Sequence, residues 1–246
     1  MIALSRHELL WVLEQCGGAE WPYPLAPVAW PADTADETVL ARARTEDALR
    51  GRGLLAAEPA AVLLAVGTAV REAVRQVDVV RRSAADPAAA VALDGPGGAA
   101  LLRSSDHAGA PVHVRTLASA EVVAAALAVL PRLPPAPGPA LAVPPEAAAV
   151  ETRRRERDRL AVEAVLRDAV AWTQLGVAPD GVSSAGDRAD ARIRWLDSPR
   201  GRYRLRHDPG RGRATGGSPH LVPDDAASPG TRAEVEALLE PGRRTG

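Results

Sequence analysis

The sequence of 246 residues predicts an α+β fold, in which helices and antiparallel strands occupy separate stretches of the chain. Helical periodicity with capping signals comes first, short alternating or valine-rich runs follow, and an order of helix, strands and helix returns after a proline-rich segment. The repetition predicts two related halves, about 1–131 and 146–246, joined by a proline-rich linker over 131–145. We expect a single domain over 1–246, because each half alone would leave the edges of its sheet open.

Helix signals open the chain. Two capping boxes, in which a Ser or Thr precedes a Glu by three residues, predict the starts of the first two helices. The two pairs are Ser5 with Glu8 and Thr34 with Glu37. The second helix should run to about Arg50, before a pair of glycines. Pro59 suits the first turn of a third helix, which continues over 60–70.

Four short runs of strand-forming residues then predict an antiparallel meander. They cover residues 74–82, 89–94, 99–104 and 112–116. Segments rich in Gly, Pro and Asp separate them, as turns between neighbouring strands require. Ser119 is expected to cap an apolar helix over 120–130, which closes the first half.

The second half is predicted to begin with a long helix over 146–172 whose first part is heavily charged. A short connection then leads to a hairpin with strands at 190–196 and 202–207. A weaker strand is expected near 220–222. Thr231 with Glu234 predicts the start of a last helix, which should run through Leu239.

The hairpin is the most informative local feature. Its alternation predicts one apolar and aromatic face directed to the core and one arginine face directed outward. The arginines are Arg192, Arg194, Arg202, Arg204 and Arg206. Two interpretations stay open, namely a solvated face neutralised by neighbouring carboxylates and a docking surface for an acidic or polar partner. A nucleic-acid partner is not favoured, because no aromatic residues interleave with the arginines and the net charge is −1.

Composition excludes several kinds of chemistry. All 30 basic residues are arginines, which excludes a Walker A phosphate loop and a Schiff-base lysine. Cys16 is the single cysteine, which excludes an intrachain disulfide and a multi-cysteine metal site. The five histidines show no metal-ligand spacing, and no acid–base pair or nucleophile motif stands out. We therefore expect no enzyme, no cofactor and no metal.

The sequence also predicts where the protein works. The longest apolar runs are well short of the roughly 20 residues that a membrane-spanning helix needs. The N-terminus reads directly into a helix start and lacks the layout of a signal peptide. We therefore expect a cytoplasmic protein that does not insert into membranes.

Three stretches carry a resemblance to a known family. They are the proline-rich segment Glu20–Leu25, the helix end and following residues Ala48–Leu55, and the turn Asp197–Tyr203. Together with the order of elements over nearly the whole chain, they resemble the EspG family. Its members are cytosolic chaperones associated with type VII (ESX) secretion in GC-rich Gram-positive bacteria.

The resemblance implies a central antiparallel sheet built from two quasi-twofold halves and flanked by helical bundles. It implies binding of PPE-type substrates, usually as PE–PPE heterodimers, at the tip of the substrate's helical bundle, which keeps them soluble and directs them to one secretion system. The regions implied are the exposed sheet face, the second-half helices and the loop joining the first two long strands, here with Asp86 and Pro87.

We therefore predict a docking surface formed by Arg192, Arg194, Arg204 and Arg206 with neighbouring apolar positions, in a monomer or weak homodimer. One alternative is a scaffold domain of the same fold, possibly homodimeric, that serves another partner. A further alternative is an enzyme with an unrecognised site, which a deep pocket gathering His113 or His207 with a carboxylate would support.

Overall fold

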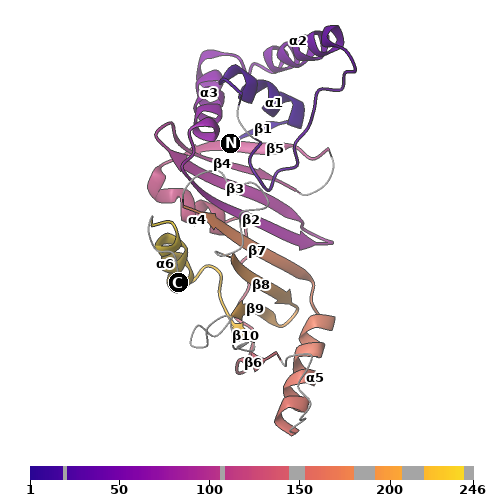
Figure 1. Ribbon diagram of the computed structural model, residues 1–246, viewed down its shortest axis with the longest axis vertical. Helices are drawn as coiled ribbons and strands as arrows, with labels where there is room; N and C mark the ends of the chain where they lie inside the picture. The colour runs from indigo at the N-terminus through magenta and orange to yellow at the C-terminus, as the bar shows by residue number, and fades with distance from the viewer. Residues whose placement is uncertain (19–20, 106–108, 144–152, 180–191, 207–218, 241–246) are drawn as a thin grey trace.

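The computed structural model describes residues 1–18, 21–105, 109–143, 153–179, 192–206 and 219–240. Ten strands form one sheet in the order β1-β5-β4-β3-β2-β7-β8-β9-β10-β6, and neighbouring strands pair antiparallel (Figure 1). The strands are β1 (Ile2–Leu4), β2 (Arg75–Ser83), β3 (Ala88–Gly95), β4 (Gly98–Ser104), β5 (Val112–Leu117), β6 (Leu141–Ala142), β7 (Ala171–Ala178), β8 (Arg192–Ser198), β9 (Gly201–Arg206) and β10 (His220–Pro223). The helices are α1 (Arg6–Gln15), α2 (Ala35–Gly51), α3 (Ala57–Arg71), α4 (Val122–Leu127), α5 (Arg153–Arg167) and α6 (Pro229–Leu238), with a 3₁₀ turn η1 (Ser119–Glu121) before α4. The α+β fold is confirmed.

The first two helices begin as predicted. The Ser5 hydroxyl accepts a hydrogen bond from the backbone N–H of Glu8 at 3.1 Å, and the Glu8 carboxylate accepts one from the backbone N–H of Ser5 at 2.6 Å. Thr34 and Glu37 form the same reciprocal pair ahead of α2. Each box satisfies backbone donors that a helix start would otherwise leave unpaired.

Two other predicted caps are wrong. Ser119 is not the cap of a helix over 120–130, because it is the first residue of η1, and α4 begins only at Val122. The last helix begins at Pro229, two residues before Thr231, and the Ser228 hydroxyl caps it. Proline in the first turn suits this earlier start, since its missing N–H would have no partner there.

The predicted helix over 146–172 is wrong at its C-terminal end. Residues 146–152 lie outside the described part of the chain, and α5 ends at Arg167. Residues 171–178 form β7, which pairs with β2 along its whole length. The segment contains alanine, leucine and glutamine, which suit a helix, but pairing with β2 decides its conformation.

The proline-rich linker is part of the sheet. Leu141 and Ala142 form β6, which pairs with β10 at one end of the sheet, and Pro135 bridges to Arg202. Backbone hydrogen bonds between Ala136 and Arg202 and between Arg202 and Pro134 fix this contact. The linker therefore lies against the second half as well as connecting the two halves.

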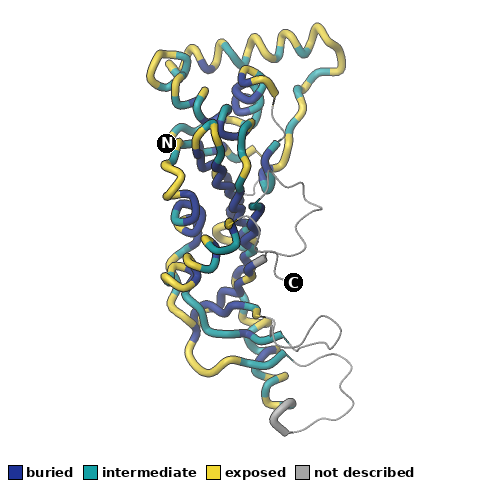
Figure 2. The backbone as a smooth tube through the Cα atoms, turned by 60° about the vertical axis from the view of Figure 1, so that its left-hand side comes forward, coloured by how far each residue is buried: buried dark blue, intermediate teal, exposed yellow. Residues whose placement is uncertain are grey.

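Helices cover the two faces of the sheet unequally (Figures 1 and 2). On one face, α4 and α6 pack over the middle strands around Val79, Leu175 and Trp195. On the opposite face, α3 covers β3, β4 and β5, and α1 packs on α3 and β1. On the same face, α5 packs beside β8, β9 and β10 through Val162 and Leu196. Between these two covered regions, part of β2 and β7 stays open to solvent on the opposite face, which we call the open face.

Candidate docking surface

The arginines of the β8–β9 hairpin do not share one face. The two-residue turn 199–200 places Trp195 opposite Arg204, and Arg194 opposite Leu205. Directly opposed residues lie on the same side of a sheet, so Arg204 points with Trp195 and Arg194 points the other way. The predicted common arginine face is therefore wrong, because shifting the register by one residue moves a strand's side chains to the opposite face.

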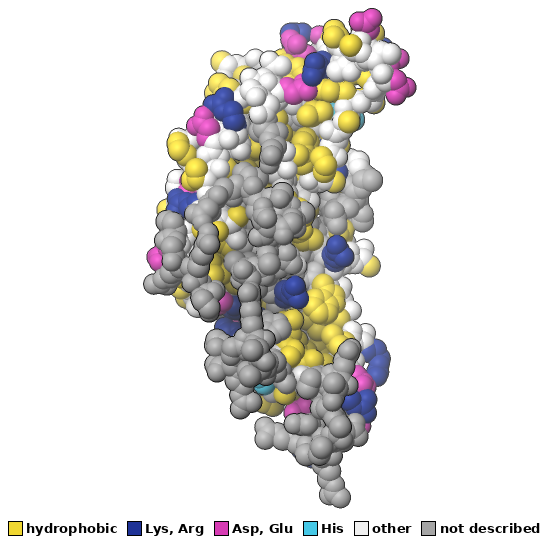
Figure 3. Space-filling model, viewed as in Figure 1, with side chains coloured by type: hydrophobic (Ala, Val, Ile, Leu, Met, Phe, Trp, Pro, Cys, Tyr) yellow, Lys and Arg dark blue, Asp and Glu magenta, His cyan; other side chains and the backbone are white. Residues whose placement is uncertain are grey.

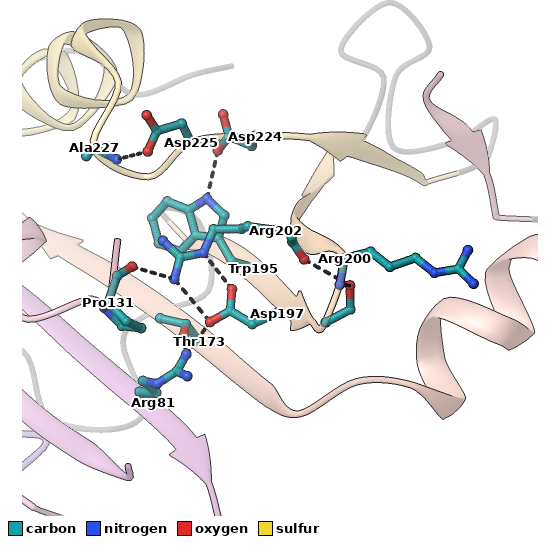
Figure 4. A network of polar contacts seen from close by, with 12 residues as sticks. Arg81, Pro131, Thr173, Trp195, Asp197, Arg200, Arg202, Asp224, Asp225 and Ala227 are labelled. Carbon is teal, nitrogen blue, oxygen red and sulfur yellow. Dashed lines mark hydrogen bonds and ion pairs between the residues drawn. The ribbon is translucent and has the colours of Figure 1, made fainter. Parts of the chain in front are cut away.

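Arg202 is buried against the core instead of facing outward. Its Nε and Nη2 atoms lie 2.6 and 3.0 Å from the two carboxylate oxygens of Asp197, and Nη2 donates to the carbonyl of Pro131 at 3.2 Å. Arg81 of β2 pairs with the same carboxylate from the other side (Figure 4). Asp197 therefore joins two guanidinium groups on the face of the sheet that α4 and α6 cover, which we call the covered face.

Arg204 is also buried, which corrects its prediction as a surface residue. Its Nη1 atom lies 2.7 Å from Oε2 of Glu234 on α6. Arg206 is half-exposed, with Nη2 3.9 Å from the same carboxylate. Arg204 and Arg206 are thus neutralised by a neighbouring carboxylate, as the first of the two interpretations of the arginine face expects. Arg192 belongs to β8, but its side chain lies outside the description.

Arg194 belongs to a different surface, which lies on the open face. We call the following residues the central patch: Tyr23, Val80, Arg82, Trp172, Gln174 and Arg194. Two rows of directly paired residues build it across the strands. One row is Val80, Gln174 and Arg194, and the other contains Arg82 and Trp172. Together they line a shallow recess of about 400 Å³.

A second recess continues the central patch toward α5. It holds about 510 Å³ and shares Arg82 and Trp172 with the first. Its other walls come from Pro87 in the β2–β3 loop and from Leu166 and Val170 at the end of α5. The Trp172, Leu166 and Val170 side chains are 45, 47 and 53% exposed, a high value for large apolar residues in one area. Figure 3 shows hydrophobic side chains gathered here with arginines beside them.

The charge around this surface is positive. Arg82 and Arg194 are exposed, and the described carboxylates form no ion pair with either side chain. An apolar area between two such arginines suits an apolar helix that also offers carboxylates or its C-terminal carbonyls. The linings of the two recesses contain no histidine.

Asp86 lies beside this surface and is ion-paired. Its two carboxylate oxygens each lie 3.2 Å from the Arg81 guanidinium. A hydrogen bond from the Ser83 hydroxyl lowers the pKa of Asp86, and so does Arg81, against the smaller opposing effect of burial. Asp86 is therefore held in its charged form.

The described residues show no membrane span or metal site. None of their helices combines the length and the hydrophobicity needed to cross a bilayer. They also contain no group of His, Cys, Asp and Glu side chains arranged to hold a metal ion. His113 lies on β5 between β1 and β4, and His207 lies outside the described part of the chain.

Comparison with known proteins identifies the family. A sequence model of the EspG family matches residues 5–225. This chain belongs to the EspG family. Among solved structures, it is similar to the Mycobacterium tuberculosis type VII secretion system chaperone EspG5, solved in complex with a PE25-PPE41 dimer. The TM-score is 0.56 at 13% identity, over 97% of this chain and 95% of that chain. A search of curated proteins finds no match.

Membership of the EspG family accounts for the fold expected from the resemblance, and the structural likeness agrees with it. Sequence reasoning nevertheless missed most of the central patch. Trp172 was placed in a helix, and Arg82 was treated as part of an ordinary strand. The signal available in the sequence was the β-branched Thr173 between the aromatic Trp172 and the polar Gln174, which suits a strand.

Proposed function

We propose that this EspG-family chain is a cytosolic chaperone of type VII secretion. It binds the helical tip of a PE/PPE-type substrate, keeps it soluble and directs it to the secretion machinery. The family match over residues 5–225 carries the proposal. The similar chaperone EspG5 has been solved with a PE25-PPE41 dimer, which supports the same class of partner here. The protein acts through a binding surface and is not an enzyme.

The central patch is the proposed centre of the docking site. Burial of Trp172 and Val80 against apolar side chains of the substrate tip would supply the favourable free energy. Arg82 and Arg194 would pair with carboxylates or helix C-terminal carbonyls of the substrate and so set its orientation. A stable interface uses roughly 20–30 residues a side. The partner must therefore reach beyond the patch, onto the β2–β3 loop and α5.

Co-expression with a PE/PPE-type helical-bundle protein tests the proposal. We expect the wild-type chain to capture this protein in a pull-down. Arg194→Glu should weaken capture about tenfold or more, since it places a negative charge where a carboxylate or carbonyl is expected. Arg44→Glu on the exposed side of α2 is the matched control and should capture normally.

Two outcomes would contradict the proposal at different levels. If Arg194→Glu captures the substrate as well as wild type while its circular dichroism stays native, the open face is not the docking site. If the wild-type chain captures nothing and forms a homodimer in solution, the scaffold role of the same fold replaces the chaperone role.

A further inference from the structure

The β2–β3 loop is tied to the buried interior of the second half. Arg81, near the end of β2, is almost fully buried on the covered face of the sheet. Its Nη1 atom donates to the carboxylate of Asp197 on β8 and lies 3.5 Å from the Thr173 hydroxyl on β7. Its Nε and Nη2 atoms both reach the carboxylate of Asp86 in the loop. One side chain thus connects β7, β8 and the loop.

The charges of this network show why the loop must hold Asp86 close to Arg81. Arg81 and Arg202 are both buried, and both pair with the single buried carboxylate of Asp197 (Figure 4). The second carboxylate that the structure gives to these two guanidiniums is Asp86. A buried charge without a partner is strongly unfavourable. The network is therefore neutral only while the loop keeps Asp86 against Arg81.

The same loop forms one wall of the second recess, beyond the ends of β2 and β3. Arg81 and Arg82 are consecutive residues of a strand, so their side chains point to opposite faces. Arg82 lines both recesses of the open face, and Pro87, directly after Asp86, lines the second. The position of Asp86 on the covered side thus determines where Pro87 lies on the open side.

Local turn chemistry alone holds the loop weakly. The Ser83 hydroxyl accepts hydrogen bonds from the backbone N–H groups of Ala85 and Asp86 at 3.2 and 3.4 Å. These distances are at or beyond the long end of the usual range for such bonds. The contacts of Asp86 with Arg81 are also long, at 3.2 Å, but they are charge-assisted, which makes them the stronger type of restraint.

We propose that Asp86 is a positioning residue of the docking surface, which fixes the β2–β3 loop by neutralising buried Arg81 and does not itself contact the substrate. The role of Asp86 in docking rests on the proposed function. Its structural part concerns the free protein and can be tested without a substrate.

Nuclear magnetic resonance on the full chain, with ¹⁵N-labelled arginine and backbone, tests the structural part. In the wild type, the Nε–H signal of Arg81 should exchange slowly with water because its proton is buried and bonded. Asp86→Asn should abolish this protection and speed amide exchange of Ala84 and Ala85 roughly fivefold or more. Asp47→Asn, which removes the charge of an exposed pair with Arg50, is the control and should change neither signal.

Ser83→Ala separates the two restraints on the loop. It removes the local turn bonds and the hydrogen bond from the Ser83 hydroxyl to the Asp86 carboxylate but leaves the ion pair, so the Arg81 signal should persist. If Asp86→Asn leaves both the Arg81 signal and the loop amides as in wild type, the loop is held by the turn alone and the proposal is overturned.

Binding distinguishes positioning from direct contact. With a PE/PPE-type helical-bundle protein as the probe, the Arg81 Nε–H signal should remain protected in the complex. Asp86→Asn should weaken the affinity about three- to tenfold by loosening the loop. Loss of the Arg81 signal on binding would show that Asp86 moves to the substrate, which overturns the positioning role. If the wild type binds nothing, the proposed function fails, while the measurements on the free protein still decide the role of Asp86 in the loop.

Discussion

At the scale of single residues, the central observation is that arginines in one hairpin have different roles. Arg202 and Arg204 are buried with carboxylate partners, whereas Arg194 is exposed on the opposite face. An alternation of residue types shows that two faces exist. It does not show which residues of the second strand share a face with which residues of the first, because a turn one residue longer or shorter reverses the answer.

Asp197 is the residue on which the buried network most depends. Asp197→Asn should destabilise the protein by about 3–5 kcal/mol, because it leaves two buried guanidiniums without their common counter-charge. Urea unfolding followed by circular dichroism measures the change. The conservative Asp47→Asn in the exposed part of α2 should stay within about 0.5 kcal/mol of wild type. An equally small effect of Asp197→Asn would show that the network contributes little to stability.

At the scale of elements, capping signals predicted a helix start correctly where no 3₁₀ turn and no earlier capping residue took the place of the predicted cap. The pairs at Ser5 and Thr34 formed as expected. At Ser119, a 3₁₀ turn takes the place of the first turn of the predicted helix. At Thr231, an earlier Ser228 followed by Pro229 provides a better start, so the residue predicted to cap the helix lies inside it.

The two corrected caps should differ in how much they contribute to stability. Ser228→Ala should cost about 1 kcal/mol of stability, since its hydroxyl accepts a hydrogen bond from the backbone N–H of Thr231 at 3.1 Å. Ser119→Ala should cost less than about 0.5 kcal/mol, because no such cap is lost at that position. Both values come from chemical unfolding of the two single variants. A larger loss for Ser119→Ala than for Ser228→Ala would reverse this assignment.

At the scale of the whole molecule, the pairing of β2 with β7 joins the two meanders into one sheet. The strand order β5-β4-β3-β2 is followed by β7-β8-β9-β10, so the two halves meet antiparallel at the first strand of each meander. This arrangement supports the proposal of two related halves with boundaries near 131 and 146, which stays a prediction about the origin of the chain. It also creates the open face, since the helices of each half cover only the outer strands there.

Gly176 tests how closely the joint is packed. A Cβ atom at this position would lie 2.4 Å from Oδ2 of Asp78 and 3.0 Å from its Cγ. Gly176→Ala should therefore destabilise the protein by about 1–3 kcal/mol through overpacking. In Gly51→Ala the new Cβ meets no atom within 4 Å, so this variant should be neutral or slightly stabilising. Thermal unfolding of both variants measures the difference, and equal melting temperatures would contradict close packing at the joint.

Local patterns along the chain were sufficient to predict the α+β class, the first three helices, the meander from β2 to β5, the hairpin and the family resemblance. These features depend on local periodicity, caps and turn residues, which a single chain segment carries. The family match confirms the resemblance.

The conformation of residues 171–178, the register of the hairpin and the composition of the central patch could not be predicted from local patterns. Each depends on pairing between segments far apart in the chain, such as Arg82 of β2 with Trp172 of β7. Residues 171–178 mix helix formers such as alanine, leucine and glutamine with strand formers such as threonine and valine, so the partner strands select their conformation. A surface assembled from Tyr23, β2, β7 and β8 leaves no contiguous pattern in the sequence, because the fold alone brings these residues together.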